Sequence, residues 1–225
     1  MIVLEGVSKS FATGGPPRVV ARELDFVVQD RARLALLGRN GAGKSSLLQL
    51  IAGSLRPDRG RIIRRSRVSW PVGFQGSFHP DLTGAENSRF VARLYARPAP
   101  EFLNFVEGFA ELGSYFREPL RHYSAGMRAR LAFAISMAVP FDIYLIDEVT
   151  SVGDARFREK SEQLLRSRLA QCGAIVVSHS LELLARLCTS GVVLENGRLF
   201  YYARVARAIE HHQYLMRGQL PPWLR

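Results

Sequence analysis

The stretch that most constrains the fold is Gly38-Arg39-Asn40-Gly41-Ala42-Gly43-Lys44-Ser45. It follows the apolar run 34–37 and precedes residues 46–51, whose apolar spacing suits a helix packed on a sheet. In such a strand-loop-helix setting the spacing G-x-x-x-x-G-K-S predicts a phosphate cradle, because glycines let backbone N–H groups turn inward and a helix N-terminus is electropositive. We expect Lys44 to reach the β- and γ-phosphates and the Ser45 hydroxyl to hold Mg²⁺. A turn that binds nothing is the alternative, and the complete pattern argues against it.

Length and composition describe an ordinary globular protein. At 225 residues the chain can bury one sizeable core, in one or two domains. Met1–Ser10 lacks the basic-then-apolar order of a signal peptide, and the longest apolar run, Leu131–Val139, is too short to span a bilayer. Cys172 and Cys188 match no metal spacing, which favours reduced thiols. We therefore expect a cytoplasmic protein that reaches a membrane only through a partner.

The formal net charge is +11, and the basic residues fall in several places, notably 56–67, 117–130 and 156–168. A solvated basic surface explains such a charge without any ligand. An anionic membrane face, an anionic polymer and nucleic acid are the functional alternatives. The charge alone does not decide among them.

The segments around 2–7, 19–28 and 33–37 read as strands, and a turn at 56–61 precedes further strands at 62–63 and 68–74. Phe11 lies at a strand end, where an aromatic ring either packs in the core or stacks on a purine. Gln75 ends a strand beside a loop. It is either an exposed polar residue or a donor of a side-chain oxygen to Mg²⁺.

Residues 79–140 form helical segments separated by breakers, which predicts a helical subdomain inserted into an α/β core. Ser124 has the chemistry of an N-cap for the helix that runs to Ala138. This is either a capped helix and nothing more, or a second anion site in which the Ser124 hydroxyl, the Gly126 backbone and the helix N-terminus meet a phosphate.

An apolar strand at 141–146 ends in Asp147 and Glu148. Its continuous apolar character indicates burial on both faces, as in a parallel sheet. Asp147 fits a carboxylate that binds Mg²⁺ through water, and Glu148 fits a group that polarises an attacking water. His179 follows the strand 174–177, at the sheet edge where α/β proteins bind ligands, and there it can hydrogen-bond a γ-phosphate. A lone histidine is otherwise a surface or core residue.

Six features, in order along the chain, resemble those of one family: GRNGAGKS, Gln75, YSAGM, IYLIDE, SVGDA and His179. They resemble the Walker A motif, Q-loop, signature, Walker B motif, D-loop and H-loop of ATP-binding-cassette (ABC) ATPases. The resemblance implies an α/β fold, an ABC-type P-loop NTPase core with a mixed, mainly parallel sheet, antiparallel N-terminal strands and an inserted helical subdomain. In a single nucleotide-binding domain, 1–225, residues 1–75 and 141–225 would form the ATP-binding core and 76–140 the helical and signature subdomain.

The resemblance also assigns roles by position. The catalytic residues it implies are Glu148, His179 and Lys44. Its ATP-binding residues are Phe11, Gly38, Arg39, Asn40, Gly41, Ala42, Gly43, Lys44, Ser45, Ser46 and Gln75. The signature residues, acting on the nucleotide of a second copy, are Tyr123, Ser124, Ala125, Gly126 and Met127, and the D-loop residues are Gly153 and Asp154. The metal ligands are Ser45, Gln75 and Asp147. The departures, SAGM for SGGQ, Ser46 for threonine and SVGD for SALD, remove no group that hydrolysis needs.

The segments YSAGMRARLAF and IDEVTSVGDARF are similar to ATP-binding subunits of capsular polysaccharide exporters, with O-antigen and teichoic-acid exporters as relatives. Those relatives often carry a carbohydrate-binding extension, so a chain ending at Arg225 leads us to expect the capsular type. The resemblance implies ATP and Mg²⁺ as ligands, and a homodimer that closes over two ATP molecules.

The implied partners are an integral-membrane permease, in two copies, and periplasm-spanning components. The implied substrate is an anionic, lipid-linked polysaccharide, and the place of action is the cytoplasmic face of the inner membrane. A small-molecule transporter shares all this chemistry and differs in its partner. The alternative from another class is a soluble ABC ATPase acting on nucleic acid or ribosomes. Such proteins usually carry two cassettes or a large inserted arm, so we expect no nucleic-acid partner.

Overall fold

The computed structural model describes residues 1–74, 76, 78–147 and 154–224. These residues divide into two compact units. The first consists of residues 1–71, 141–147 and 166–224, and the second of residues 72–140 and 154–165. No helix within the described ranges is long and apolar enough to cross a bilayer.

The first unit begins with an antiparallel three-stranded sheet of order β2-β1-β4. Its strands are β1 (Ile2–Phe11), β2 (Arg18–Val28) and β4 (Arg59–Arg64). The antiparallel N-terminal strands were predicted, but the turn predicted at 59–61 is wrong. Those residues are already in β4, because Ser8 of β1 pairs with Arg59 and a left-handed Gly60 (φ 77°) accommodates the shift in register. Pairing between distant segments thus overrides the local turn signal.

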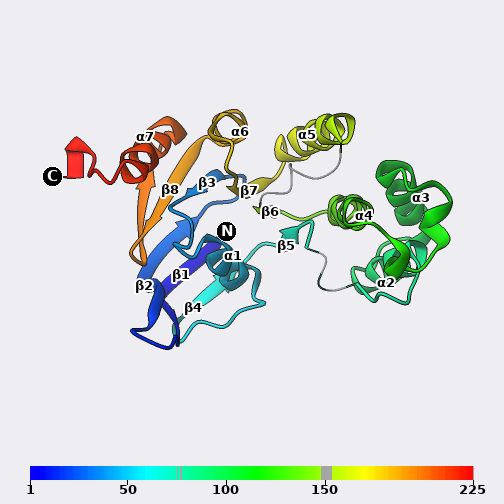
Figure 1. Cartoon of the computed structure of the whole chain (residues 1–225), viewed down its shortest axis with the longest axis horizontal. Coiled ribbons are helices and arrows are strands. Elements are labelled where there is room, and N and C mark those ends of the chain that lie inside the picture. The colour runs from blue at the N-terminus through cyan, green and yellow to red at the C-terminus, as the bar shows by residue number, and fades with distance from the viewer. Residues whose placement is uncertain (75, 77, 148–153, 225) are drawn as a thin grey trace. The chain divides into compact units, whose positions relative to one another are not determined.

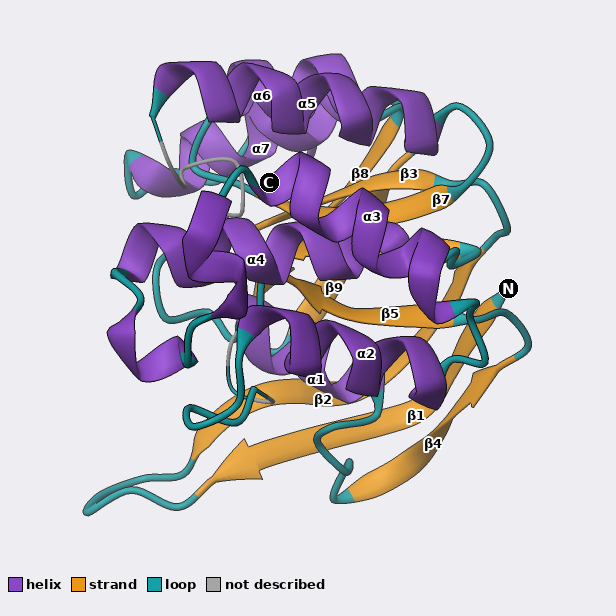
Figure 2. Ribbon diagram, turned by 90° about the vertical axis from the view of Figure 1, so that its right-hand side faces the viewer, coloured by secondary structure: helices purple, strands orange, loops and turns teal. Residues whose placement is uncertain are grey.

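A mixed six-stranded sheet, shown in Figure 2 with the strands in orange, follows the order β5-β6-β7-β3-β8-β9. Its strands are β5 (Val68–Val72), β6 (Ile143–Asp147), β7 (Gly173–Val177), β3 (Arg33–Leu37), β8 (Ser190–Glu195) and β9 (Arg198–Tyr202). The pairs β6·β7, β7·β3 and β3·β8 are parallel, and β9 returns antiparallel after the Asn196-Gly197 turn. The carboxyl ends of β3, β6 and β7 therefore lie at one edge, where α/β sheets bind ligands.

The helices of this unit are α1 (Lys44–Ala52), α6 (Leu181–Leu187) and α7 (Val205–Met216). Leu47, Leu48 and Leu50 of α1 are buried in a core that also takes side chains from both sheets. The helix ends at Gly53, and Arg64 of β4 donates from Nε to the carbonyl of Ile51 at 2.6 Å. This cap satisfies a carbonyl that the helix leaves unpaired and ties α1 to the first sheet.

The second unit is helical, as predicted, and contains α2 (Gly84–Leu94), α3 (Ala99–Ala110), α4 (Ala125–Ala138) and the first part of α5 (Ala155–Leu169), which Figure 1 draws in green and yellow. Thr83 and Glu86 form a reciprocal capping box at the start of α2. The expected domain limits placed all of α5 in the core. The structure instead packs Phe157 of α5 against Phe109 and Phe133, which draws the first part of this helix into the helical unit.

Candidate functional site

The predicted phosphate loop lies between β3 and α1 and is packed closely from two sides. A Cβ on Gly38 (φ 151°) would lie 2.5 Å from the carbonyl oxygen of Leu194 in β8. A Cβ on Gly43 (φ 103°), which caps α1, would lie 2.6 Å from Cγ1 of Val20 in β2. Both positions require glycine because a side chain would meet neighbouring strands and strain the backbone. The fold therefore fixes the path of the loop between β2 and β8.

Lys44 opens α1, and its ammonium group is turned back into the loop. Its Nζ donates to the carbonyl oxygen of Gly38 at 2.8 Å and to that of Arg39 at 3.1 Å. The amide of Ala42 donates to the Arg39 carbonyl at 3.0 Å. Ser45 is exposed, and the helix N-terminus adds partial positive charge. The loop thus brings a cation and a helix terminus to one anion-binding concavity.

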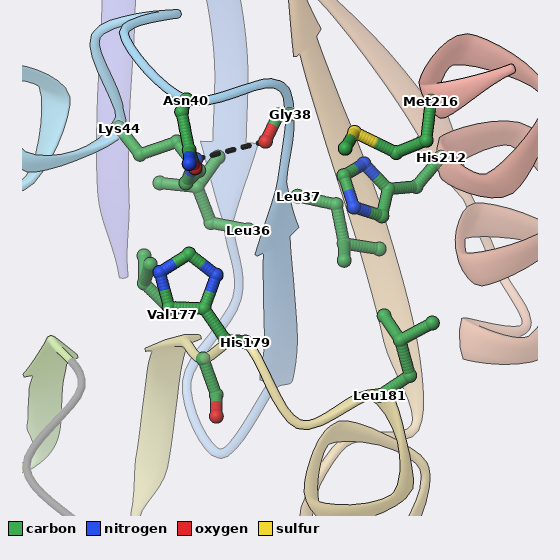
Figure 3. Close-up of a pocket in the computed structure, with 11 residues that line it drawn as sticks. Leu36, Leu37, Gly38, Asn40, Lys44, Val177, His179, Leu181, His212 and Met216 are labelled. Carbon is green, nitrogen blue, oxygen red and sulfur yellow. Dashed lines mark hydrogen bonds between the residues drawn. The ribbon is translucent and has the colours of Figure 1, made fainter. Parts of the chain in front are cut away.

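A pocket of about 210 Å³ joins this loop to the end of β7. Gly38, Asn40, Lys44 and His179 all line it, as Figure 3 shows, and α7 closes it from the facing side. Asp147, the last residue of β6, pairs in register with Val177 of β7, two residues before His179. The structure therefore brings together the predicted loop, His179 and the end of β6 at one sheet edge.

Phe11 ends β1 and is not a core residue, since 37% of it is exposed. The Lys9 ammonium lies 5.5 Å from the centroid of its ring and pairs with the Asp58 carboxylate at 2.6 Å. The Lys9 hydrogen bond, followed by one from the Ser10 amide, lowers the pKa of Asp58. An exposed ring with a cation fixed beside it fits the stacking interpretation of Phe11 better than the core interpretation.

The YSAGM residues belong to the helical unit. Ser124 is the N-cap of α4, as predicted, and its hydroxyl accepts from the Met127 amide at 3.2 Å. Ser124 and Ala125 are exposed, whereas Tyr123 is buried. The Tyr123 hydroxyl donates to the carbonyl of Tyr115 at 2.6 Å, and burial raises its pKa to about 12. Tyr123 therefore holds the segment in place, and the serine and the helix N-terminus face solvent.

Asp154 is exposed and stands just before α5. Its carboxylate accepts from the Phe157 amide at 2.8 Å and from Arg130 at 2.7 Å. The Phe157 hydrogen bond is the main cause of its lowered pKa. Three other predicted site residues, Gln75, Glu148 and Gly153, lie outside the described residues, and their roles stay predictions from the sequence.

Sequence reasoning missed Arg18, His212 and Met216. Arg18 opens β2 and donates from its guanidinium to the carbonyl of Gly41 in the phosphate loop. His212 and Met216 of α7 line the pocket opposite Lys44 and His179 (Figure 3). Burial, followed by the charge of Lys44, lowers the pKa of His212. No local pattern marks these residues, because they meet the loop only through the packing of distant segments.

The oxygen donors at this edge suit a hard cation. Ser45 offers a hydroxyl and Asp147 a carboxylate, and Mg²⁺ favours such oxygen ligands. Among the described residues no group of three or more His, Cys, Asp or Glu side chains is placed to hold a metal. Mg²⁺ usually takes one or two protein oxygens together with substrate phosphates and water, so these two donors fit such an ion.

Comparison with known proteins decides the family. The family described as "ABC transporter" matches residues 21–151. The chain belongs to the ABC transporter family. It is 46% identical to the polysialic acid transport ATP-binding protein KpsT of Escherichia coli, over 95% of this chain and 96% of that protein. It is 42% identical to the capsule polysaccharide export ATP-binding protein CtrD of Neisseria meningitidis, over 96% of this chain and 100% of that protein.

Solved ABC structures share the fold. The dimeric cassette MJ0796, bound to ADP and phosphate, matches with a TM-score of 0.77 at 22% identity and covers 91% of this chain and 99% of that one. The predicted fold class, an ABC-type P-loop NTPase core with a helical subdomain, is confirmed. As a member of this ATPase family, the chain binds and hydrolyses ATP.

Proposed function

We propose that the chain is the ATP-hydrolysing subunit of an ABC transporter that exports capsular polysaccharide. The observation that carries the proposal is its 46% identity to a polysialic acid transport protein and 42% to a capsule export protein. The O-antigen export protein RfbB of Klebsiella pneumoniae is less similar, at 37% identity over 90% of the chain. Export of O-antigen or teichoic acid is therefore the second candidate.

ATP would bind with its base on Phe11 and its phosphates on residues 38–46. Lys44 then exchanges the carbonyls of Gly38 and Arg39 for β- and γ-phosphate oxygens. His179 lines the same pocket and donates a hydrogen bond to the γ-phosphate. Glu148, which follows Asp147 in the sequence, would polarise the attacking water.

Mg²⁺ would be held by Ser45, by Gln75 and, through water, by Asp147. Once bound, it neutralises charge on the β- and γ-phosphates. Ser45 and Asp147 supply the oxygen ligands that this ion prefers.

Two chains would complete the site. A phosphate bound on one surface leaves its γ-oxygens facing water, so a second helix N-terminus clamps it only by bringing two surfaces together. The exposed Ser124 and Ala125 at the start of α4, with Gly126 and Met127 behind them, offer such a surface. The D-loop residues Gly153 and Asp154 would line the same interface. ATP becomes part of the dimer contact, and hydrolysis releases it.

The dimer would drive conformational changes in a transmembrane pore formed by other subunits. We place it at the cytoplasmic face of the inner membrane, bound to two copies of a permease, with periplasm-spanning components beyond them. The substrate would be an anionic, lipid-linked polysaccharide. The similarity to transport ATP-binding proteins along almost the whole chain supports this assembly.

Deleting the gene tests the substrate. Loss of surface capsular polysaccharide, with O-antigen unchanged and capsule restored by the wild-type gene, is the expected result. A retained capsule with lost O-antigen would move the protein to the second candidate.

The Glu148→Gln variant tests the mechanism. It should abolish ATP turnover, fail to restore capsule and still dimerise with ATP, whereas Glu159→Gln, on exposed α5 surface, should behave as wild type. Undiminished hydrolysis by Glu148→Gln would defeat the role given to Glu148.

A further inference from the structure

The first residues of β2 run alongside the phosphate loop. Arg18 follows two prolines, opens the strand and donates from its guanidinium to the carbonyl of Gly41. Two residues later, buried Val20 lies against Gly43, where an added Cβ would meet it at 2.6 Å. Val20 thus backs the loop, and the Arg18 charge is held at the exposed part of the loop.

The same arginine stands opposite the aromatic residue proposed to stack on the base. In the β1·β2 pairing Phe11 and Arg18 are register partners. Lys9, which is fixed by Asp58, lies beside the Phe11 ring. The Arg18 side chain therefore bridges from the strand position facing Phe11 to the loop that would take the terminal phosphates. In a nucleotide that spans these two points, the ribose and the α-phosphate lie between them.

Within the described part of the chain, no carboxylate forms an ion pair with Arg18. By contrast, other arginines of the described residues form ion pairs with carboxylates, among them Arg61, Arg67, Arg117, Arg121 and Arg130. A guanidinium is always charged and carries several N–H donors in a planar fork. One donor anchored on Gly41 leaves others for a phosphate oxygen, so the geometry suits bidentate anion recognition.

We propose that Arg18 is a nucleotide-binding residue that holds the α-phosphate of ATP and ADP, with Gly41 as its anchor in the empty protein. The inference rests on the proposed ATPase function and assigns a residue outside the six motifs. Since ATP and ADP share the α-phosphate, Arg18 stabilises both complexes equally. This separates it from Lys44 and His179, whose contacts favour the terminal phosphates.

Titration calorimetry of the full chain with ATP and with ADP tests the proposal. The measurements are made at low temperature so that ATP is not hydrolysed. Arg18→Ala should weaken binding of both nucleotides by the same factor, about tenfold, as expected for loss of a charged hydrogen bond. Arg18→Lys should recover part of the loss because it keeps the charge. The matched control is Arg22→Ala, which removes the same charge from an exposed position of β2 and should bind as wild type.

Competition by pyrophosphate separates ligand contact from loop shaping. Pyrophosphate occupies the β- and γ-positions, so Arg18→Ala should leave its affinity unchanged if Arg18 acts on the α-phosphate. An equal loss for pyrophosphate, a loss for ATP but not ADP, or an equal loss in Arg22→Ala would each overturn the inference. If the wild type and Arg18→Ala bind ATP with equal affinity, only the role of Arg18 is refuted. Wild type that binds no nucleotide refutes the proposed function as well.

Discussion

Replacement of Gly43 by alanine is the sharpest test of how the fold shapes the phosphate loop. The new Cβ would lie 2.6 Å from Cγ1 and 3.1 Å from Cβ and Cγ2 of Val20, and φ is 103°. The left-handed backbone costs a non-glycine residue about 1–2 kcal/mol. The overlap with Val20, which is 1% exposed and cannot move into solvent, costs about 1–3 kcal/mol more.

A double-mutant cycle separates these two costs. Val20→Ala alone should destabilise the protein by roughly 1.5–3 kcal/mol, through lost burial and a small cavity. It also removes both methyl groups that the new Cβ would meet. In that background Gly43→Ala should cost the backbone strain and one remaining close contact, 3.1 Å from Cβ of residue 20, so the two changes should couple by most of the overlap cost, about 1–2 kcal/mol.

Chemical unfolding of the four proteins, followed by circular dichroism, measures the coupling. Gly218→Ala is the matched control because Gly218 also has a positive φ (70°) and an added Cβ there meets nothing within 4 Å. Its cost should be the same with and without Val20→Ala. A coupling between Val20 and Gly43 no larger than that of the control would refute the close packing of β2 on the loop.

Three further predictions concern other parts of the molecule. His179→Ala should lower ATP turnover by about 100-fold or more, with ADP affinity unchanged, because in the proposed mechanism this pocket-lining residue contacts only the γ-phosphate; steady-state hydrolysis and calorimetry measure both. Thr83→Ala should destabilise α2 by about 1 kcal/mol, since it removes the capping box with Glu86; faster amide exchange in α2 would show it. Burial lowers the pKa of His211 and of His212, so the unfolded chain takes up protons near pH 6.5 that the folded chain does not. Unfolding free energy should therefore fall as the pH drops below about 6.5, and the double variant His211→Asn, His212→Asn should show a flatter pH profile.

The parts of the site that could be predicted are those that depend on the spacing of residues close together in the sequence. The phosphate loop, the N-cap at Ser124 and the strand that ends at Asp147 each need only a few neighbouring residues to be recognised. The hairpin at Asn196-Gly197 is equally local, because both residues take the positive φ that its tight turn requires. Each of these features can therefore be recognised without knowing which distant segments pack against it.

The parts that could not be predicted depend on pairing between distant segments. β4 begins at Arg59 only because β1 offers it a partner. The first part of α5 joins the helical unit only because Phe157 meets Phe109 and Phe133 there. Arg18 reaches the phosphate loop through a register that no single segment encodes. Such contacts become visible only once both segments are placed.

The ammonium of Lys44 has a consequence for what can occupy the loop. The Lys44 ammonium already donates to the carbonyls of Gly38 and Arg39. An anion that binds Lys44 must therefore replace these two hydrogen bonds. Each anion oxygen must bind the Lys44 ammonium more favourably than a peptide carbonyl that already lies at hydrogen-bond distance. Small anions that cannot also reach the helix terminus and the far end of the site gain little by that exchange. We therefore expect the loop to favour ligands long enough to engage several of its groups at once over a single phosphate ion.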